Sequence, residues 1–257
     1  MAHAPTSRAW QAGGVALGTG RREAVLFDVF GTLVDYQPDR SRLTYPSTCD
    51  LLRRWGHEMS PESFVAEWDA ASTALEHASS RTLEEFTMFD AATSFADATG
   101  LPLSPAQCHE LAATFLDEWQ AHVVPIAGVA DLLTRLAPRF RIGIVSNTHD
   151  PGMVPSILGG MGVADHLDMV LLSVDHGHRK PHPSIYRAAI DLLGSPASEI
   201  SFVGDSFEAD YLGPTRAGMT AYLVDPTSAH DLPARNRLDS ILDLEARLDS
   251  PPASHSL

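Results

Sequence analysis

Asp28 has the sequence setting of a nucleophilic carboxylate. It follows the wholly apolar run Ala24–Phe27, the pattern of a strand buried on both faces of a parallel sheet, and a tight turn with Gly31 and Thr32 comes directly after it. An ionised carboxylate at the end of such a strand is unfavourable unless cations or hydrogen-bond donors meet it there. A carboxylate can attack phosphorus or activated carbon and later leave, so the segment predicts covalent catalysis by Asp28.

Three further segments place polar residues where apolar patterns end: Ser146, Asn147 and Thr148 after residues 141–145, Lys180 just before a predicted helix, and Asp205 and Asp210 after residues 200–204. In open α/β sheets, ligands bind outside the carboxyl ends of the strands. We therefore expect Asp28, Ser146 and Asp205 to converge on one crevice. There, Ser146 and Asn147 would donate to a transferring oxygen, and Lys180 would offset the carboxylates.

The elements that position these residues form an alternating pattern. Between about residues 125 and 224, strands are predicted near 141–145, 169–172, 200–203 and 221–224, and helices near 128–137, 153–158, 184–193 and 207–217. This alternation implies a parallel sheet with helices on both faces, and Ala24–Phe27 must be a strand of the same sheet. Apolar residues after Val224 are sufficient for a short closing element: Leu238, Ile241, Leu242 and Leu244.

Residues 37–124 read instead as an all-helical insert. Ser60-Pro61 and Ser104-Pro105 each have the form of an N-cap followed by proline at the first helical position, and Gln107 completes a capping box with Ser104. Two sets of apolar residues recur at helical spacing: Phe64, Trp68, Ala71 and Leu75, then Leu111, Phe115 and Trp119. We predict that these aromatic side chains mainly pack a core of their own.

In order and residue type, these segments resemble the four motifs of the haloacid dehalogenase superfamily of hydrolases, over about residues 24–224. The resemblance implies an α/β fold, with a Rossmann-like parallel-sheet core (residues 23–36 and 125–247) and a smaller all-helical cap domain (residues 37–124). The cap would close over the site and select the substrate, with hinges near residues 35–39 and 122–125.

The resemblance also implies a magnesium site. In phosphatases of the superfamily, Mg²⁺ is bound by the nucleophile, a backbone carbonyl two residues later and an acidic residue of the fourth motif, which here are Asp28, the carbonyl of Phe30, and Asp205. Mg²⁺ prefers such oxygen ligands. Asp210 would bind a metal water, orient Lys180 or help to activate the attacking water. Three residues next to the motif positions are predicted to contact substrate: Phe30, Thr32 and Thr148.

Phe30 is where this chain departs from the phosphatase pattern. Most phosphatases of the superfamily have a second aspartate there, which protonates the leaving oxygen, and losing a general acid costs ~10²- to 10⁴-fold in rate. An aromatic residue at this place resembles the metal-independent 2-haloacid dehalogenases, whose halide needs no proton. The acidic fourth motif resembles instead the Mg²⁺-dependent members of the superfamily. Without a metal, Asp28 and Asp205 would be neighbouring carboxylates, and the pKa of one of them would rise.

Composition excludes some partners. The 257 residues include 18 Lys and Arg against 33 Asp and Glu, which gives a net charge of −15. Such a surface repels the nucleic-acid backbone and anionic lipid, so we expect neither nucleic acid nor membrane as a partner. A small anionic substrate fits if the site concentrates positive charge. The sequence defines no oligomeric state.

The termini and cysteines suggest a cytoplasmic protein. Residues 1–22 lack the continuous apolar region of a signal peptide and read as a loose arm, and residues 248–257 read as a flexible tail. Cys49 and Cys108 are predicted to be reduced thiols.

Weighing the metal site above the missing acid, we predict a Mg²⁺-dependent hydrolase or phosphotransferase that acts on a small phosphorylated metabolite. The first alternative is a 2-haloacid dehalogenase that forms an ester on Asp28. The second alternative is a catalytically weak member of the superfamily that binds a ligand or partner.

Overall fold

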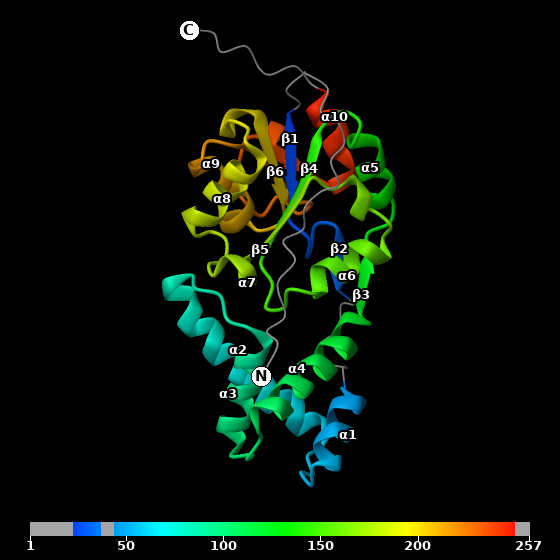
Figure 1. Ribbon diagram of the computed structural model, residues 1–257. Coiled ribbons are helices and arrows are strands. Elements are labelled where there is room, and N and C mark those ends of the chain that lie inside the picture. The colour runs from blue at the N-terminus through cyan, green and yellow to red at the C-terminus, as the bar shows by residue number, and fades with distance from the viewer. Residues whose placement is uncertain (1–22, 37–43, 250–257) are drawn as a thin grey trace, which may run out of the picture.

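Six parallel strands form the sheet at the centre of the larger of two lobes (Figure 1). The computed structural model describes residues 23–36 and 44–249. The strands lie in the order β5-β4-β1-β6-β7-β8. Their bounds are Ala24–Phe27 (β1), Arg141–Ser146 (β4), Met169–Leu172 (β5), Ile200–Gly204 (β6), Thr220–Val224 (β7) and Arg237–Leu238 (β8).

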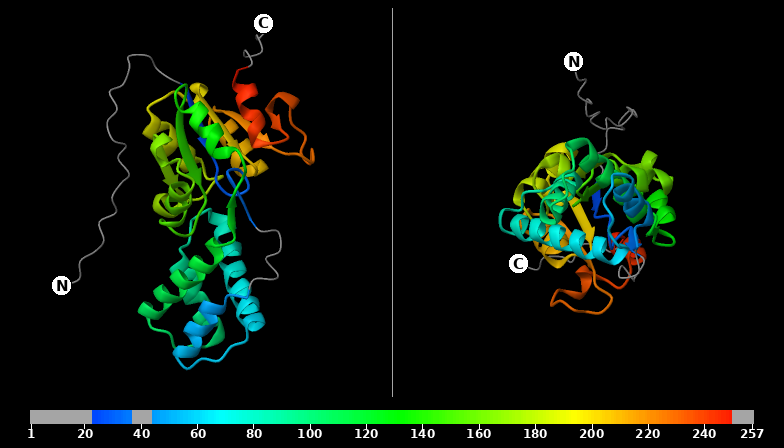
Figure 2. Two further views of the ribbon diagram at one scale, coloured as in Figure 1. Left: turned by 90° about the vertical axis from the view of Figure 1, so that its right-hand side faces the viewer. Right: turned by 90° about the horizontal axis from the view of Figure 1, so that it is seen from below.

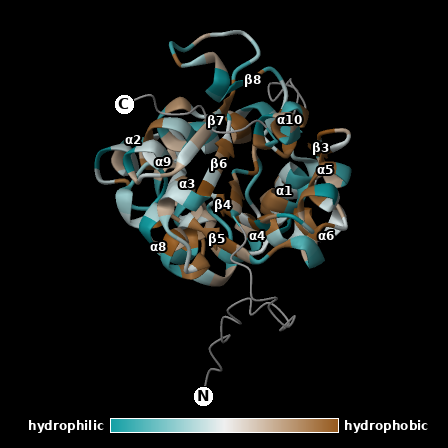
Figure 3. Cartoon of the chain, turned by 90° about the horizontal axis from the view of Figure 1, so that it is seen from above, coloured by the Kyte–Doolittle hydropathy of each residue, from teal (hydrophilic) through white to brown (hydrophobic). Residues whose placement is uncertain are grey.

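Strand β1 is buried on both faces, as its apolar run predicts. Val25 and Phe27 belong to one hydrophobic cluster, whereas Ala24 and Leu26 belong to another on the opposite face of the sheet. This division follows from the two-residue period of a strand. Figure 3 shows apolar residues concentrated in the central strands. The nucleophile strand therefore lies at the middle of the core, with its carboxyl end directed toward the second lobe (Figure 1).

Helices cover both faces of the sheet. Their bounds are Val129–Leu136 (α5), Met153–Gly160 (α6), Ser173–His176 (α7), Pro183–Leu193 (α8), Gly213–Arg216 (α9) and Leu244–Leu248 (α10), with 3-10 turns at Ala164–His166, Ala197–Glu199, Ala234–Asn236 and Ile241–Asp243. Helices α5, α6 and α10 contribute to the cluster that contains Phe27, and α8 contributes to the cluster that contains Leu26. The predicted α/β fold with a Rossmann-like parallel sheet is therefore confirmed.

The smaller lobe is helical and has a core of its own. It contains Pro46–Arg54 (α1), Pro61–Thr82 (α2), Met88–Thr99 (α3) and Pro105–Gln120 (α4). Ser60 and Ser104 cap α2 and α4 as predicted, and the capping box between Ser104 and Gln107 is present. Phe64 and Trp68 of α2 pack against Phe95 of α3 and Phe115 of α4. Cys49 and Cys108 are buried free thiols, as expected.

The two segments that connect the lobes lie side by side. Val34–Tyr36 (β2) pairs antiparallel with Val123–Pro125 (β3), so the chain enters and leaves the helical lobe through one short ribbon. Figure 2 shows this ribbon between the lobes. Part of one predicted hinge, residues 37–39, lies outside the described residues.

One predicted helix is divided in the structure. Residues Phe207–Leu212 form a π-helical segment (η4), and α9 continues it to Arg216. π-Helical turns are common at functional sites because they displace one side chain from the regular helical positions. The predicted N-terminal arm (residues 1–22) and most of the predicted tail lie outside the described residues. Among the residues described, no helix has the length and apolarity needed to span a bilayer.

Candidate active site

The carboxyl ends of three neighbouring strands bring the predicted residues together. Asp28 follows β1, Ser146 ends β4 and Asp205 follows β6, and β4 and β6 are the two strands that flank β1. The backbone N–H of Asp28 donates to the carbonyl of Val203 at 2.9 Å, which extends the β1–β6 pairing to the nucleophile position. The expected convergence on one edge of the sheet is therefore found.

Lys180 bridges two carboxylates in a buried position. Its Nζ donates to Asp28 Oδ1 and to Asp210 Oδ1, each at 2.7 Å, and the lysine side chain is only 2% exposed. Oxygen atoms of Asp28, Asp205 and Asp210 lie within 4.8 Å of one another. Of the three roles considered for Asp210, orienting Lys180 is thus the one with a direct contact. The site holds three carboxylates and one ammonium.

This crowding of carboxylates changes their protonation. Burial, opposed by Lys180 and reinforced by Asp210, raises the pKa of Asp28 to about 7. Asp205 is open to solvent, yet the surrounding protein and the Asp210 carboxylate raise its pKa to about 6. Burial lowers the pKa of Lys180, but Asp210 and Asp28 outweigh it, so the net shift is upward and the ammonium stays charged. Additional positive charge at this site would favour the ionised nucleophile.

Two glycines make this close arrangement possible. Gly31 has a φ of 82°, and a Cβ at this position would lie 2.2 Å from Asp205 Oδ2. A Cβ on Gly204 would lie 2.3 Å from Cγ of Asp210. Any other residue at either position would push a carboxylate out of place. Gly31 of the first motif thus leaves room for the Asp205 side chain, and Gly204 of the fourth motif leaves room for that of Asp210.

Asn147 has partners other than those expected. Its Nδ2 donates to the carbonyl of Lys180 at 2.9 Å, and its Oδ1 accepts from the backbone N–H of Lys180 at 2.7 Å. Both ends of the amide are therefore used to fix the lysine backbone. This contact positions Lys180 beside the carboxylates. The predicted donation from the amide to a transferring oxygen stays a prediction, because Nδ2 carries a second hydrogen.

The hydroxyl residues lie close to the site but are buried. Ser146 is fully buried, and its Oγ lies 3.4 Å from the carbonyl of Asn147. Thr32 is also fully buried, and its Oγ1 has no hydrogen-bond partner among the described residues. The backbone N–H of Thr148 donates to Ser173 Oγ at 2.9 Å. Substrate binding by Thr32 and Thr148 stays a prediction.

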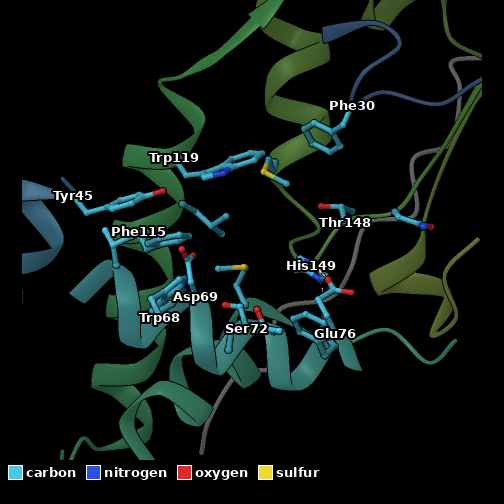
Figure 4. A pocket seen from close by; sticks show the side chains of 18 residues that line it. Phe30, Tyr45, Trp68, Asp69, Ser72, Glu76, Phe115, Trp119, Thr148 and His149 are labelled. Atoms are coloured by element: carbon cyan, nitrogen blue, oxygen red, sulfur yellow. Dashed lines mark hydrogen bonds and ion pairs between the residues drawn. The ribbon is translucent and has the colours of Figure 1, made fainter. Parts of the chain in front are cut away.

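A cavity of about 560 Å³ lies between the site and the helical lobe (Figure 4). Phe30, Asn147 and Thr148 line it from the larger lobe, and helices α2, α3 and α4 supply much of the remaining wall. Phe30 packs edge-on against Trp119 of α4, with ring centroids 5.8 Å apart. Phe30, two residues after Asp28 in the chain, therefore forms part of the cavity wall on the side of the larger lobe.

A partly buried network of charges joins the lobes next to the catalytic loops. Glu85, only 1% exposed, accepts from Ser173 Oγ at 2.6 Å, from the guanidinium of Arg179 and from His149 Nδ1 at 3.0 Å. Glu76 of α2 pairs with the same arginine and histidine. Sequence reasoning missed this network because Glu85 lies 64 residues from His149 and 94 from Arg179. No local pattern marks such partners.

His149 should make stability depend on pH. Burial lowers its pKa, but hydrogen bonds to Glu76 and Glu85 outweigh this and raise it from 6.5 to about 9. Since the folded pKa exceeds the unfolded one, the stabilisation is complete below about pH 6.5 and is lost as pH rises through 9. It amounts to ~3 kcal/mol at most. We expect His149→Gln to lower the thermal midpoint by about 5 °C at pH 6 and far less at pH 10.

The matched control is His77→Gln, which removes an exposed imidazole from α2 and should change neither midpoint. An equal loss for His149→Gln at both pH values would mean that the ring acts only by packing on Phe86, which it stacks against at 4.1 Å.

Comparison with known proteins agrees with this geometry. The family of haloacid dehalogenase-like hydrolases matches residues 23–218. The chain therefore belongs to this family of hydrolases. A human relative, haloacid dehalogenase-like hydrolase domain-containing protein 3, is 33% identical over 138 residues, which are 51% of this chain and 53% of the human protein. The chain thus spans about half the length of that relative.

A longer match is to ribulose-1,5-bisphosphate 5-phosphatase of Halopiger xanaduensis, which is 26% identical over 214 residues, covering 81% of this chain and 87% of that protein. Among solved structures, a 2-haloacid dehalogenase from Pseudomonas syringae has a TM-score of 0.64 at 20% identity, covering 89% of this chain and 98% of that one. The hydrolase YfnB from Bacillus subtilis, bound to magnesium, has a TM-score of 0.62 at 19% identity, covering 90% and 100%. At these identities the structures show a shared fold.

Proposed function

We propose that this hydrolase is a Mg²⁺-dependent phosphatase or phosphotransferase acting on a small phosphorylated metabolite. The observation that carries the proposal is the group of three carboxylates within 4.8 Å of one another around a single buried ammonium. With Lys180 charged, the ionised group has a net charge of −2. That charge suits a divalent cation and a phosphoryl group bound together, and it is unfavourable without them.

The residues fit the metal that the family implies. Carboxylate oxygens are the ligands that Mg²⁺ prefers, and Asp205 is open to solvent, so the site can admit an ion that keeps several waters. Asp28 and Asp205 would hold the ion, with the backbone carbonyl of Phe30 as the third predicted ligand from the protein. When bound, Mg²⁺ would supply positive charge for the phosphoryl oxygens and for the nucleophile.

The chain's own residues account for the two steps. An oxygen of Asp28 forms a bond to phosphorus as the bond from phosphorus to the leaving oxygen breaks, and both electrons of that bond go to the leaving group. Water then attacks phosphorus, so that phosphate leaves and the Asp28 carboxylate is restored. Lys180 donates to Asp28 Oδ1 and so holds one carboxylate oxygen while the other is available for attack. Asn147 fixes the backbone of that lysine.

Phe30 supports a second candidate function. A phenylalanine two residues after the nucleophile cannot protonate a leaving oxygen, and a halide leaving group requires no proton. A 2-haloacid dehalogenase would use the same Asp28 to form an ester with carbon. The cluster of Asp28, Asp205 and Asp210 favours the phosphatase, since a metal-free site would place these carboxylates together with one lysine only.

Chelation distinguishes the two functions. Phosphate and halide release should be assayed over panels of small phosphate esters, acyl phosphates and 2-haloacids, with excess chelator and with Mg²⁺ added back. We expect chelator to remove phosphate release and to lower the thermal midpoint, and Mg²⁺ to restore both, because an ion bound only by the native state stabilises it.

Asp205→Asn should lose the midpoint shift caused by Mg²⁺, whereas Asp239→Asn, which removes an exposed carboxylate outside the site, should retain it. Full phosphate release in chelator would contradict the metal site. Halide release without Mg²⁺ would establish the dehalogenase instead.

A further inference from the structure

Aromatic side chains dominate one wall of the cavity beside the site. Tyr45 and Trp68 each stack on Phe115, with ring centroids 4.6 Å and 4.2 Å from that of Phe115, and Trp119 stands edge-on to Phe30. All five of these residues line the cavity. Its volume of about 560 Å³ suits a small organic group. Rings arranged in this way offer both faces and edges to an aromatic ligand.

Helix α2 adds a polar stripe to the cavity. Four residues of this stripe line the cavity: Asp69, Ser72, Thr73 and Glu76. Ser72 and Thr73 are three and four residues after Asp69, and Glu76 is four and three residues after them, so all four lie on one face of the helix. Glu76 is paired with Arg179 and His149. Asp69, in contrast, forms no hydrogen bond or ion pair with any residue in the described ranges, and Figure 4 shows it reaching from α2 toward the side that Phe115 and Trp119 line.

The charge of the cavity is therefore negative. Of the described residues that line it, the acidic and basic ones are Asp69, Glu76 and His149, and none is lysine or arginine. Glu76 and His149 offset one another, which leaves the Asp69 carboxylate without a counter-charge. A leaving group with a carboxylate or a second phosphate would be repelled here, whereas an amine cation would pair with Asp69 next to the aromatic rings.

Phe30 restricts the leaving group independently. It lines the cavity two residues after Asp28 in the chain, and its side chain has no proton to donate. A phenolate leaves without a general acid far more readily than an alkoxide, because it is the weaker base. A substrate with an aromatic ring bonded directly to the phosphate oxygen would thus react without a general acid, and its ring would also fill the cavity.

We propose, on the basis of the proposed phosphatase function, that the substrate is an aryl phosphate whose ring carries a basic amine, with the ring among Trp68, Phe115 and Trp119 and the amine beside Asp69. In the transfer, the bond between phosphorus and the phenolic oxygen breaks, the electron pair stays on that oxygen as phenolate, and solvent protonates it. The bond from Asp28 to phosphorus forms in the same step. The cavity selects the ring and its charge, and takes no part in the bond changes.

The test compares esters of similar leaving-group acidity that differ in charge: tyramine O-phosphate, phenyl phosphate and 3-(4-phosphonooxyphenyl)propionate. We expect kcat/KM to fall in that order. Asp69→Asn should lower kcat/KM for tyramine O-phosphate by about tenfold, the scale of one hydrogen bond to a charged group, and should raise it for the propionate. Acetyl phosphate, whose leaving group is too small to reach the cavity, should be turned over equally by both proteins.

Glu67→Gln is the matched control, since it removes one exposed carboxylate from the same helix outside the cavity. It should leave the order of substrates unchanged. Equal kcat/KM for the three aryl esters, or an equal loss on all of them in Asp69→Asn, would overturn the proposed selection while leaving phosphatase function in place.

Binding of the free phenols separates this inference from the proposed function. Trp68 and Trp119 line the cavity, so tyramine should quench tryptophan fluorescence at lower concentration than 3-(4-hydroxyphenyl)propionate, and Asp69→Asn should remove that preference. If the enzyme releases no phosphate but retains this preference, the phosphatase function fails and the cavity's selectivity stands. If neither phenol binds, the selectivity fails whatever the enzyme hydrolyses.

Discussion

Asp28→Asn is expected to abolish turnover of every substrate, to below about 1% of the wild-type rate, because the amide has no charge with which to attack. The fold should survive. The amide retains the shape of the carboxylate, and a neutral group is easier to keep in a position where burial raises the pKa of the acid to about 7. Lys180 keeps its second carboxylate partner, Asp210. Steady-state rates and thermal midpoints of both proteins measure the two effects.

Asp175→Asn serves as the control, because Asp175 is an exposed aspartate of α7. It should retain full activity. Residual turnover above 1% in Asp28→Asn, with an unchanged midpoint and with deamidation excluded by mass spectrometry, would count against covalent catalysis by Asp28.

The fold follows largely from local patterns. The run Ala24–Phe27 is apolar because both faces of β1 are covered, and that run alone identifies a central strand. Proline after serine marks the first turns of α2 and α4 because proline lacks the N–H that this position leaves unpaired. Helix α3 begins with a capping box between Thr87 and Asp90, so its start carries a local signal of the same kind.

The convergence of Asp28, Ser146 and Asp205 also follows from the sequence, since a parallel sheet brings the carboxyl ends of its strands to one edge. The partners of Lys180 are a different matter. Its contacts with Asp28 and Asn147 span 152 and 33 residues, and only the packed structure brings these groups together. The same applies to Glu85, whose side-chain partners Ser173, His149 and Arg179 come from three separate segments of the larger lobe.

The cavity shows how one pattern can serve two purposes. Trp68 and Phe115 recur at helical spacing, and they do pack the core of the helical lobe as predicted. Both also line the cavity. Periodicity identifies the face of a helix that is covered, but it does not distinguish a side chain buried on all sides from one that leaves an edge free for a ligand.

Phe30→Asp is expected to change which phosphate esters the enzyme hydrolyses. If Phe30 occupies the place of a general acid, the new carboxyl should speed release of alkoxide leaving groups by up to ~10²-fold, the low end for general acid catalysis. Aryl and acyl phosphates should gain far less, since their leaving groups need little protonation. The gain is limited by packing, because the Phe30 ring contacts Trp119 and a smaller, charged side chain must replace it there.

Phe30→Asn is the control that separates chemistry from packing, because it removes the ring and adds a side chain of the same size that has no acidic proton. Rates should be measured for alkyl, aryl and acyl phosphates in the wild type and in both variants. We expect the selective gain on alkyl phosphates in Phe30→Asp alone. Equal changes for all leaving groups would show that Phe30 does not occupy an acid's place. Wild-type halide release that disappears in Phe30→Asp would support the dehalogenase, because the ring would then belong to a site that needs no proton donor.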